Sequence, residues 1–108
     1  DFKKLVNSKN KILLCAEENG RIIGVSNTKF CTSGMTDVKI AFMDALYVAD
    51  DFRGKGIGKK LFFETESIAK ENGAKRLDLT VWEFNNEAIC FYKSLGMQPQ
   101  RYTFEKDL

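Results

Sequence analysis

The chain has 108 residues, which is enough for one folded domain and too few for two domains with separate cores, so we expect a single domain over residues 1–108. Hydrophobic residues make up 44% of the chain and only 1 residue is proline, a composition typical of a folded globule and not of a linker. The net charge of +2 gives no global signal for a nucleic-acid or membrane partner, and we expect neither.

The residue types exclude several kinds of catalytic site. The chain contains no histidine, which excludes Ser–His and Cys–His catalysis and the usual zinc ligand sets, so we expect no metal site. The three cysteines, Cys15, Cys31 and Cys90, are odd in number and lack metal-binding spacing. We expect each to be a small buried residue in a cytoplasmic protein. No apolar run reaches the length of a membrane span, and no secretory signal opens the chain.

The first half of the chain predicts mainly strands. Residues 1–7 have the pattern of the end of a helix, and residues 11–17 predict a strand. Asn19-Gly20 is a strong hairpin-turn signal, after which residues 21–30 predict the returning strand. Residues 31–37 predict a loop. Residues 38–48 have few polar side chains after Lys39, which indicates a central buried strand.

The second half predicts alternating helices and strands. Residues 58–72 predict a helix closed by Gly73, and residues 77–82 predict a strand that runs parallel to strand 38–48 after this crossover. A helix capped by Asn85 or Asn86 and ended by Gly96 follows, and residues 101–107 predict a closing strand. The fold class expected from this order is mixed α/β.

A glycine-rich basic loop joins strand 38–48 to the helix that follows it. Glycines at 54, 56 and 58 let the backbone approach an anion, and the helix adds the positive end of its dipole. Positive charge comes from Arg53, Lys55, Lys59 and Lys60. The loop therefore predicts a ligand with a phosphate or pyrophosphate. The alternative is an ordinary glycine-rich connector with solvated lysines.

The spacing of the loop excludes two common phosphate motifs. Three residues separate Gly54 from the Gly58-Lys59 pair, where a P-loop needs four, and Lys60 stands where that motif has Ser or Thr. The loop is also one residue too short for the dinucleotide pattern Gly-x-Gly-x-x-Gly. The pattern that fits is Arg-x-x-Gly-x-Gly, formed by Arg53, Gly56 and Gly58.

This pattern resembles the acetyl-CoA pyrophosphate loop of the GCN5-related N-acetyltransferases (GNAT). The preceding Leu-Tyr-Val at 46–48 also matches that family. In the downstream helix, Asn85, Ala88, Tyr92 and the Leu-Gly pair at 95–96 resemble its second signature. Taken without the family, that helix is a capped amphipathic helix that docks on a sheet. Two signatures in this order are far more specific than either one.

The resemblance implies the acyl-CoA N-acyltransferase fold. Its central sheet is mixed and mostly antiparallel, its two parallel central strands splay apart at one end, and helices flank it. A complete family domain begins with a strand and two helices that usually wall the acceptor groove. We expect these elements to be missing here, or to be reduced to residues 1–7.

The resemblance also implies acetyl-CoA as co-substrate. Its pantetheine arm would pair with the exposed backbone of Leu46 and Val48, beside Tyr47, like an added strand. Asn85 would bond the middle of that arm, and Tyr92 would lie near its sulfur. The remaining cofactor-binding residues would hold the pyrophosphate; they are Arg53, Gly54, Lys55, Gly56, Ile57, Gly58 and Lys59.

The implied reaction is direct attack of an amine on the thioester. The N–H of Leu46 would stabilise the oxyanion, and Tyr92 would act as general acid, although a tyrosine on the inner face of a helix is also ordinary core. Asp44 is the candidate base, because an unpaired carboxylate in an apolar strand would have a raised pKa. It could equally cap a neighbouring element or face solvent, with a bound water or an already neutral amine serving instead.

The acceptor is expected to be a primary amine of a small molecule or a protein. Four aromatic residues could line its groove, with Phe42 and Trp82 alternatively in the core; they are Phe42, Tyr47, Trp82 and Phe84. Tyr102 could face the acceptor. A homodimer through the C-terminal strands is possible by resemblance. The competing interpretations are a non-catalytic CoA-binding module and an interaction domain whose basic loop binds another phosphate.

Overall fold

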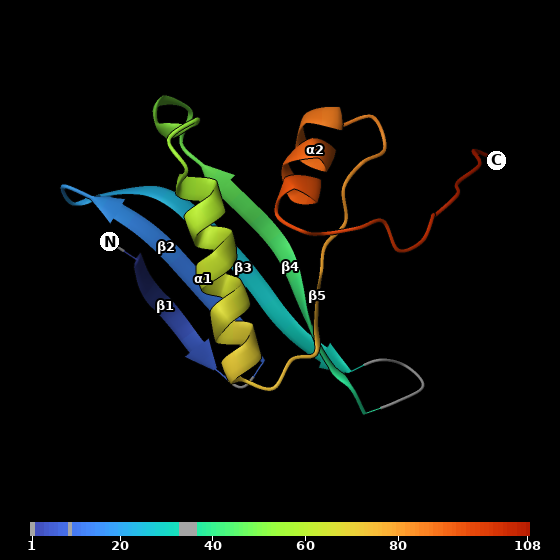
Figure 1. Ribbon diagram of the computed structural model, residues 1–108, viewed down its shortest axis with the longest axis horizontal. Helices are drawn as coiled ribbons and strands as arrows, with labels where there is room; N and C mark the ends of the chain where they lie inside the picture. Colours follow the sequence, from blue (N-terminus) through green and yellow to red (C-terminus); the bar gives the residue numbers. More distant parts are fainter. Residues whose placement is uncertain (1, 9, 33–36) are drawn as a thin grey trace.

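The computed structural model describes residues 2–8, 10–32 and 37–108. Five strands form one sheet in the order β1-β2-β3-β4-β5, with β1 to β4 antiparallel and β5 parallel to β4 (Figure 1). The chain crosses from β4 to β5 through a short 3-10 turn and α1. The elements are β1 (Phe2–Ser8), β2 (Lys11–Glu18), β3 (Arg21–Thr32), β4 (Lys39–Val48), η1 (Asp50–Phe52), α1 (Ile57–Glu71), β5 (Arg76–Asp78) and α2 (Asn86–Ser94).

The predicted hairpin between β2 and β3 is confirmed. Asn19 and Gly20 both have positive φ, at 52° and 80°, the backbone of a tight two-residue turn. The turn sets the pairing of the two strands, from Glu18 opposite Arg21 to Lys11 opposite Lys29. The hairpin ends beside the start of α1.

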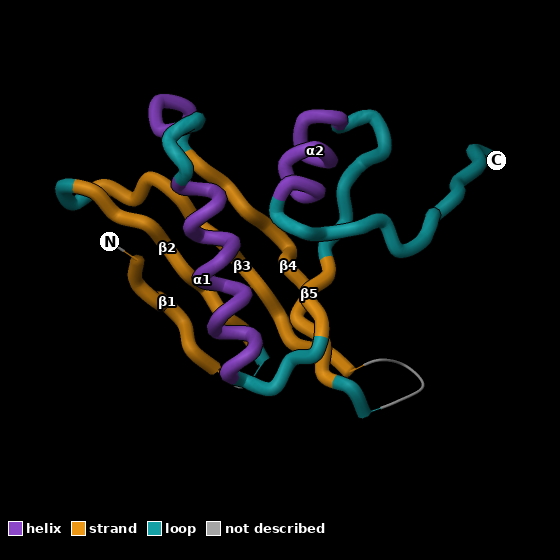
Figure 2. Tube along the Cα trace, viewed as in Figure 1, coloured by secondary structure: helices purple, strands orange, loops and turns teal. Residues whose placement is uncertain are grey.

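Helix α1 covers one face of the sheet and forms the core with it (Figures 1 and 2). Leu61 and Ile68 of the helix are buried in one cluster with Ile12, Leu14 and Ala16 of β2. The sequence predicts this, because apolar residues recur in α1 at the spacing of one helical face. The opposite face of the sheet carries no helix among the described residues.

A buried hydrogen bond and a close approach fix α1 against β3. The hydroxyls of Ser26 and Thr65 lie 2.9 Å apart in the core. A Cβ at Gly24 would lie 2.8 Å from Leu61 Cδ1 and 3.3 Å from the Tyr47 carbonyl oxygen. Glycine at this position therefore lets the helix sit close to the strand.

The prediction that residues 1–7 end a helix is wrong. Phe2–Ser8 forms β1, antiparallel to β2, from Phe2 opposite Ala16 to Ser8 opposite Lys11. Seven residues are too few for a stable isolated helix, whereas the edge of β2 offers backbone partners to a strand. Residue 1 lies outside the described residues.

Two strands predicted near the C-terminus differ in the structure. The strand expected over residues 77–82 is limited to Arg76–Asp78. Residues 101–107, expected as a closing strand, have no regular secondary structure and are exposed. A strand needs a hydrogen-bonding neighbour, and the short β5 gives little edge for one. The loop expected at residues 31–37 begins later, because β3 extends to Thr32, and residues 33–36 lie outside the described part.

The cysteines are not all buried as predicted. Cys15 is buried, but Cys31 and Cys90 are exposed. All three carry free thiols. Cys31 lies near the end of β3 and Cys90 on α2, where exposure depends on packing that composition does not reveal. Neither described helix is both long and apolar enough to cross a membrane.

Candidate functional site

The central feature of the site is the separation of β4 from β5. The two strands pair only at Ile40–Arg76, Ala41–Leu77 and Phe42–Asp78, and then diverge, as the sequence resemblance implied (Figure 1). Beyond Phe42, β4 continues for six residues with β3 on one side. Its other side has no strand neighbour among the described residues.

A β-bulge lies where the strands part. The β3–β4 register shifts between Asn27 and Thr28, so that Asn27 lies opposite Ala45, Thr28 lies opposite Met43, and Asp44 is the extra residue. Both Asp44 and Ala45 are exposed, whereas Met43 is buried. The bulge therefore places two successive side chains on the surface and interrupts the regular ladder.

The backbone of Leu46 and Val48 faces the gap. The N–H of Ala49 donates to the carbonyl of Ile23, 2.8 Å away, so Ala49 is directed toward β3. Because alternate residues of an antiparallel strand direct their polar groups to opposite sides, Tyr47 is also directed toward β3, and Leu46 and Val48 are directed away from it. The two residues named from the sequence thus present their backbone to the side where an added strand would pair.

Arg53 lies against the end of β4, on the strand that borders this gap. Its Nε donates to the Val48 carbonyl oxygen at 3.0 Å, and its NH1 lies 3.0 Å from Asp50 Oδ1. The guanidinium carbon is 5.9 Å from the centre of the Tyr47 ring. Arg53 is therefore beside the predicted phosphate loop, and its contact with Val48 occupies one acceptor that the pantetheine arm would use.

The glycine-rich loop leads into α1 with its backbone donors free. Gly54 and Gly56 have φ of 80° and 81°, a conformation that favours glycine. Gly56 is the N-cap and supplies no side-chain acceptor, and the first turn of α1 has no acidic residue. The first intrahelical bond from this end runs from Lys60 N–H to the Gly56 carbonyl, which leaves the N–H groups of residues 57–59 for an anion.

A salt bridge that sequence analysis missed anchors the turn before the loop. Arg21 at the start of β3 donates to both carboxylate oxygens of Asp51, at 2.8 and 3.0 Å. The hydrogen bond from Arg21 lowers the pKa of Asp51. Because Asp51 pairs with Arg21 and Asp50 with Arg53, both acids of the turn are engaged. No local signal reveals a pairing across 30 residues.

Asn85 caps α2, as one of its two predicted roles requires. Its Oδ1 accepts from the Ala88 N–H at 3.1 Å. The cap uses the side-chain oxygen and leaves the amide nitrogen as a donor. Helix α2 lies next to the first turn of α1, because a Cβ at Gly58 would be 3.5 Å from both Phe91 Cζ and Val48 Cγ2.

Tyr92 lies half-buried on α2, among aromatic rings. Its ring centre is 6.2 Å from that of Phe62 and 5.1 Å from that of Phe91. A tyrosine is protonated at neutral pH, and burial raises the pKa of Tyr92 further, so its phenol is available to donate a proton. The packing serves the core, and the protonation state suits a general acid.

The environment of Asp44 differs from the one expected. Its side chain is 36% exposed and its Oδ1 lies 3.7 Å from the Lys29 ammonium, so the carboxylate is neither buried nor unpaired. The bulge is the reason, because it turns Asp44 outward from an otherwise apolar strand. The premise of a desolvated base is wrong, and a catalytic role for Asp44 stays a prediction.

The aromatic candidates for the acceptor groove separate into two groups. Phe42 lines a cavity at the closed end of the gap. Trp82 and Phe84 are 66% and 71% exposed, with ring centres 6.0 Å apart, so Trp82 is not in the core. Tyr47 and Tyr102 are also exposed.

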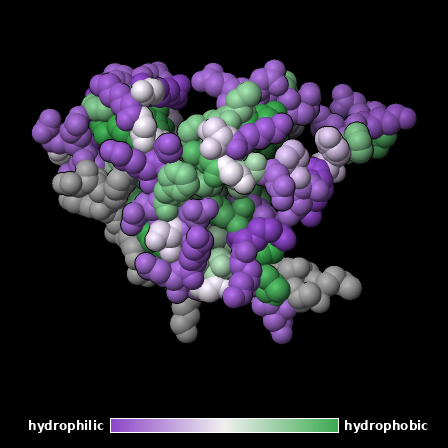
Figure 3. Space-filling model, viewed as in Figure 1, coloured by the Kyte–Doolittle hydropathy of each residue, from purple (hydrophilic) through white to green (hydrophobic). Residues whose placement is uncertain are grey.

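On the face that carries both helices, hydrophobic surface gathers in the middle of the view (Figure 3).

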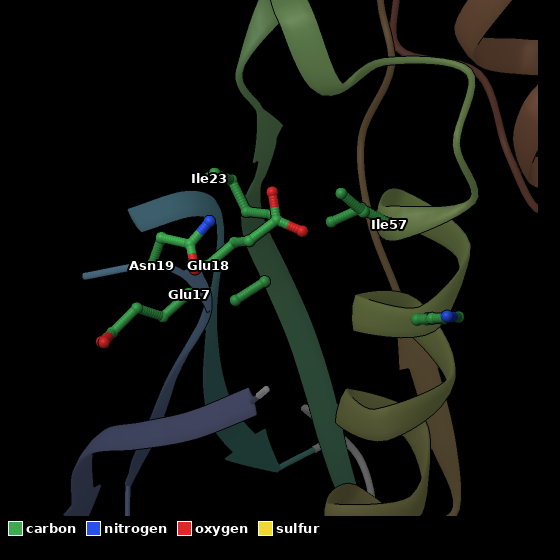
Figure 4. A pocket seen from close by; sticks show the side chains of 7 residues that line it. Glu17, Glu18, Asn19, Ile23 and Ile57 are labelled. Carbon is green, nitrogen blue, oxygen red and sulfur yellow. The ribbon is translucent and has the colours of Figure 1, made fainter. Parts of the chain in front are cut away.

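A second cavity, of about 390 Å³, lies away from this gap (Figure 4). It is formed between the β2–β3 hairpin and the first turns of α1, and Ile57 is the one predicted cofactor residue that lines it. Glu17, Glu18 and Lys60 also line it. Two carboxylates outweigh one ammonium, so the charge of this cavity does not suit the predicted pyrophosphate despite its size.

The splayed strands, the glycine loop at a helix start and the neighbouring α2 define a GNAT-type domain. Residues 1–97 match the Acetyltransferase (GNAT) family, and the chain belongs to this family. The resemblance inferred from the two signatures and the acyl-CoA N-acyltransferase fold inferred from it are confirmed.

Individual relatives agree with this assignment. The uncharacterized N-acetyltransferase YhfO of Bacillus subtilis is 30% identical over 97 residues, which are 90% of this chain and 65% of the relative. The thialysine N-epsilon-acetyltransferase of Bos taurus is 35% identical over 57 residues, or 53% of this chain and 34% of the relative. The crystal structure of a mutant BH1408 protein from Bacillus halodurans has a TM-score of 0.84 at 30% identity, covering 92% of this chain and 66% of that one. The chain thus spans two thirds or less of these relatives.

Proposed function

We propose that the protein is an acetyl-CoA-dependent N-acetyltransferase that acts on a primary amine. The observation that carries the proposal is the unpaired edge of β4 beyond Phe42, which ends at a glycine loop and a helix start with free N–H groups. An extended amide-bearing arm fits the first feature and a pyrophosphate fits the second. Membership of the GNAT family supports the same assignment.

Each proposed role uses a group in a suitable state. Leu46 N–H, directed into the gap, stabilises the oxyanion when an amine attacks the thioester carbonyl. Tyr92, whose pKa burial raises, donates its proton to the departing thiolate, and the proton that the attacking nitrogen loses restores the Tyr92 phenol through solvent. Asn85 donates from its free amide nitrogen to the pantetheine arm, and Arg53 exchanges its contact with Val48 for the pyrophosphate.

The pyrophosphate subsite combines backbone donors with mobile cations. The N–H groups of residues 57–59 point out of the start of α1, and Gly54 and Gly56 hold the loop open in front of them. Lys55 and Lys59 are exposed at the same end of the helix and add positive charge.

Acetyl-CoA titration by calorimetry tests the cofactor. We expect saturable binding to the 108-residue chain, and its loss in the double variant Arg53→Glu, Gly56→Asp. Circular dichroism shows whether that variant keeps its fold. Thiol release with a panel of primary amines then tests transfer. A folded chain that does not bind acetyl-CoA contradicts the proposal.

A non-catalytic acyl-CoA-binding module is the second candidate. The exposed and paired Asp44 favours it, because this carboxylate lacks the buried environment of a strong base. This candidate predicts acetyl-CoA binding without thiol release for any amine in the panel. A neutral amine that needs no base distinguishes the two, since its acetylation would exclude the non-catalytic module.

We further propose a small-molecule or protein amine as acceptor, action in the cytoplasm and assembly as a homodimer. The free cysteines support a reducing compartment. The dimer rests on the C-terminal segment, whose Tyr102 and Phe104 are 87% and 90% exposed. Exposed aromatic rings of this size are typical of surfaces that associate.

A further inference from the structure

A small cavity of about 220 Å³ lies at the closed end of the gap between β4 and β5. Two rows of paired residues across the sheet form its floor. Cys31, Ile40 and Arg76 make the first row, and Phe42 with Asp78 makes the second, the last pair before the strands part.

The cavity opens on the sheet face opposite α1. Phe30 packs against the core beneath α1. Successive side chains of a strand point to opposite faces, so Cys31 and its partners lie on the other face. A ligand here approaches the bulge from the side away from the helix.

The charges around this cavity favour an anion. Arg76 binds Asp78 with two hydrogen bonds, of 2.7 and 3.0 Å, so these two charges balance. Arg101, from the C-terminal segment, also lines the cavity and forms no ion pair among the residues that the structure describes. One uncompensated guanidinium remains, and its planar donors match a carboxylate.

A second ion pair lies beside the cavity. Asp44 follows Phe42 by two residues on β4, and the Lys29 ammonium lies 3.7 Å from Asp44 Oδ1 and 5.5 Å from the centre of the Phe42 ring. Because Lys29 neutralises Asp44, this carboxylate does not oppose an anion in the cavity.

We propose that this cavity holds the carboxylate of the acceptor, and that Arg101 selects amines which carry one. The inference rests on the proposed acetyltransferase function. Phe42 and Leu46 lie opposite Lys29 and Ser26, which are three residues apart on β3, or about 10 Å at the usual rise of a strand. The reacting nitrogen is thus separated from the carboxylate by a chain of several carbon atoms, as in an ω-amino acid.

Two matched acceptors test this selection. 6-Aminohexanoate and 6-aminohexanamide have the same chain and primary amine and differ only in the carboxylate. We expect the native chain to favour the acid at least tenfold in kcat/KM. Arg101→Gln should abolish this preference through KM for the acid and leave the amide unchanged. Lys106→Gln, the same charge change outside the cavity, should keep the preference.

Binding of the acid and the amide, measured in the absence of acetyl-CoA, distinguishes failure of this inference from failure of the proposed function. NMR titration should show the acid, and not the amide, shifting the signals of Ile40 and Phe42, with loss in Arg101→Gln. If the native chain acetylates the acid and the amide with equal kcat/KM, or if Arg101→Gln keeps the preference for the acid, this inference is overturned while the proposed acetyltransferase function stands. If no amine is acetylated, the proposed function fails. In that case, selective binding of the acid still supports the carboxylate site. If the acid does not bind selectively, the carboxylate site is overturned as well.

Discussion

At the scale of single residues, Tyr92 joins packing and chemistry in one side chain. Its ring contacts are made by carbon atoms, and its hydroxyl is the proton donor of the proposed reaction. Tyr92→Phe keeps the ring and removes the proton. We expect kcat to fall by about 100-fold or more, with KM for acetyl-CoA and the melting temperature nearly unchanged. Steady-state thiol release and thermal unfolding measure the two effects.

The pH dependence of kcat provides a second test of the role of Tyr92. An unperturbed tyrosine has a pKa of about 10, and burial raises the pKa of Tyr92 above that value. The acid form therefore persists through neutral and mildly alkaline pH, and kcat should not fall on the alkaline side below about pH 10. A fall near pH 8 in the native chain that persists in Tyr92→Phe would assign the limiting group elsewhere.

Substitution of Gly58 tests whether glycine is needed at this position for ligand binding or for folding. An added Cβ would meet Phe91 and Val48 at 3.5 Å, an ordinary contact, and the φ of Gly58 is not positive. Gly58→Ala should therefore leave stability unchanged or raise it by up to about 1 kcal/mol. If the pyrophosphate approaches the start of α1, the same methyl group should weaken acetyl-CoA binding at least tenfold. Calorimetry and denaturant unfolding together test this, and unchanged affinity would remove Gly58 from the subsite.

At the scale of elements, Gly24 sets how closely α1 approaches the sheet. Gly24→Ala places a Cβ 2.8 Å from the buried Leu61 and 3.3 Å from a backbone carbonyl. We expect the free energy of unfolding to fall by about 1–3 kcal/mol. Adding Leu61→Ala should recover part of the strain in a double-mutant cycle measured by urea unfolding. Strictly additive losses would show that the contact with Leu61 is not the cause.

At the N-terminus of α2, substitutions of Asn85 distinguish its role in capping the helix from its proposed role in binding acetyl-CoA. Asn85→Asp keeps an oxygen that can accept from Ala88 N–H, and so keeps the cap, but it removes the amide donor. We expect Asn85→Asp to fold as stably as the native chain and to bind acetyl-CoA less tightly. Asn85→Ala should also lose about 1 kcal/mol of stability. Equal affinity in Asn85→Asp and the native chain would limit this residue to capping.

The sequence was sufficient for the elements whose signals are local. The Asn19-Gly20 turn, the apolar face of α1, the cap of α2 and the positive φ at Gly96 all follow from residues close together in the chain. The strand at Phe2–Ser8 and the missing strand at residues 101–107 do not, because each depends on which sheet edge is available. Pairing partners are a property of the assembled sheet.

The same distinction applies to the candidate site. The loop glycines and the backbone of Leu46 and Val48 could be named in advance, since two signatures fixed their place. The exposure of Asp44 could not, because it depends on a bulge in the register with β3. The contact of Arg53 with Val48 and the bridge from Arg21 to Asp51 likewise arise only when distant segments meet.

At the scale of the whole molecule, the C-terminal segment over residues 101–108 is exposed throughout and has no regular secondary structure. Tyr102 and Phe104 stack at 6.2 Å and remain almost wholly exposed. If copies of the chain associate through this segment, sedimentation velocity should show a dimer, and Tyr102→Ser with Phe104→Ser should shift it to monomer. The double change Lys106→Ser, Asp107→Ser is the matched control in the same segment. A native chain that sediments as a monomer would contradict the proposed dimer.

The stacked pair of Trp82 and Phe84 lies directly before Asn85, the residue proposed to hold the middle of the pantetheine arm. Trp82 is the only tryptophan in the sequence and is 66% exposed, so the tryptophan fluorescence of the protein comes from one water-facing indole. A ligand that covers this indole shifts its emission to shorter wavelength. The chain therefore contains its own optical reporter, and stopped-flow mixing can follow the arrival of a ligand in the gap without any added label.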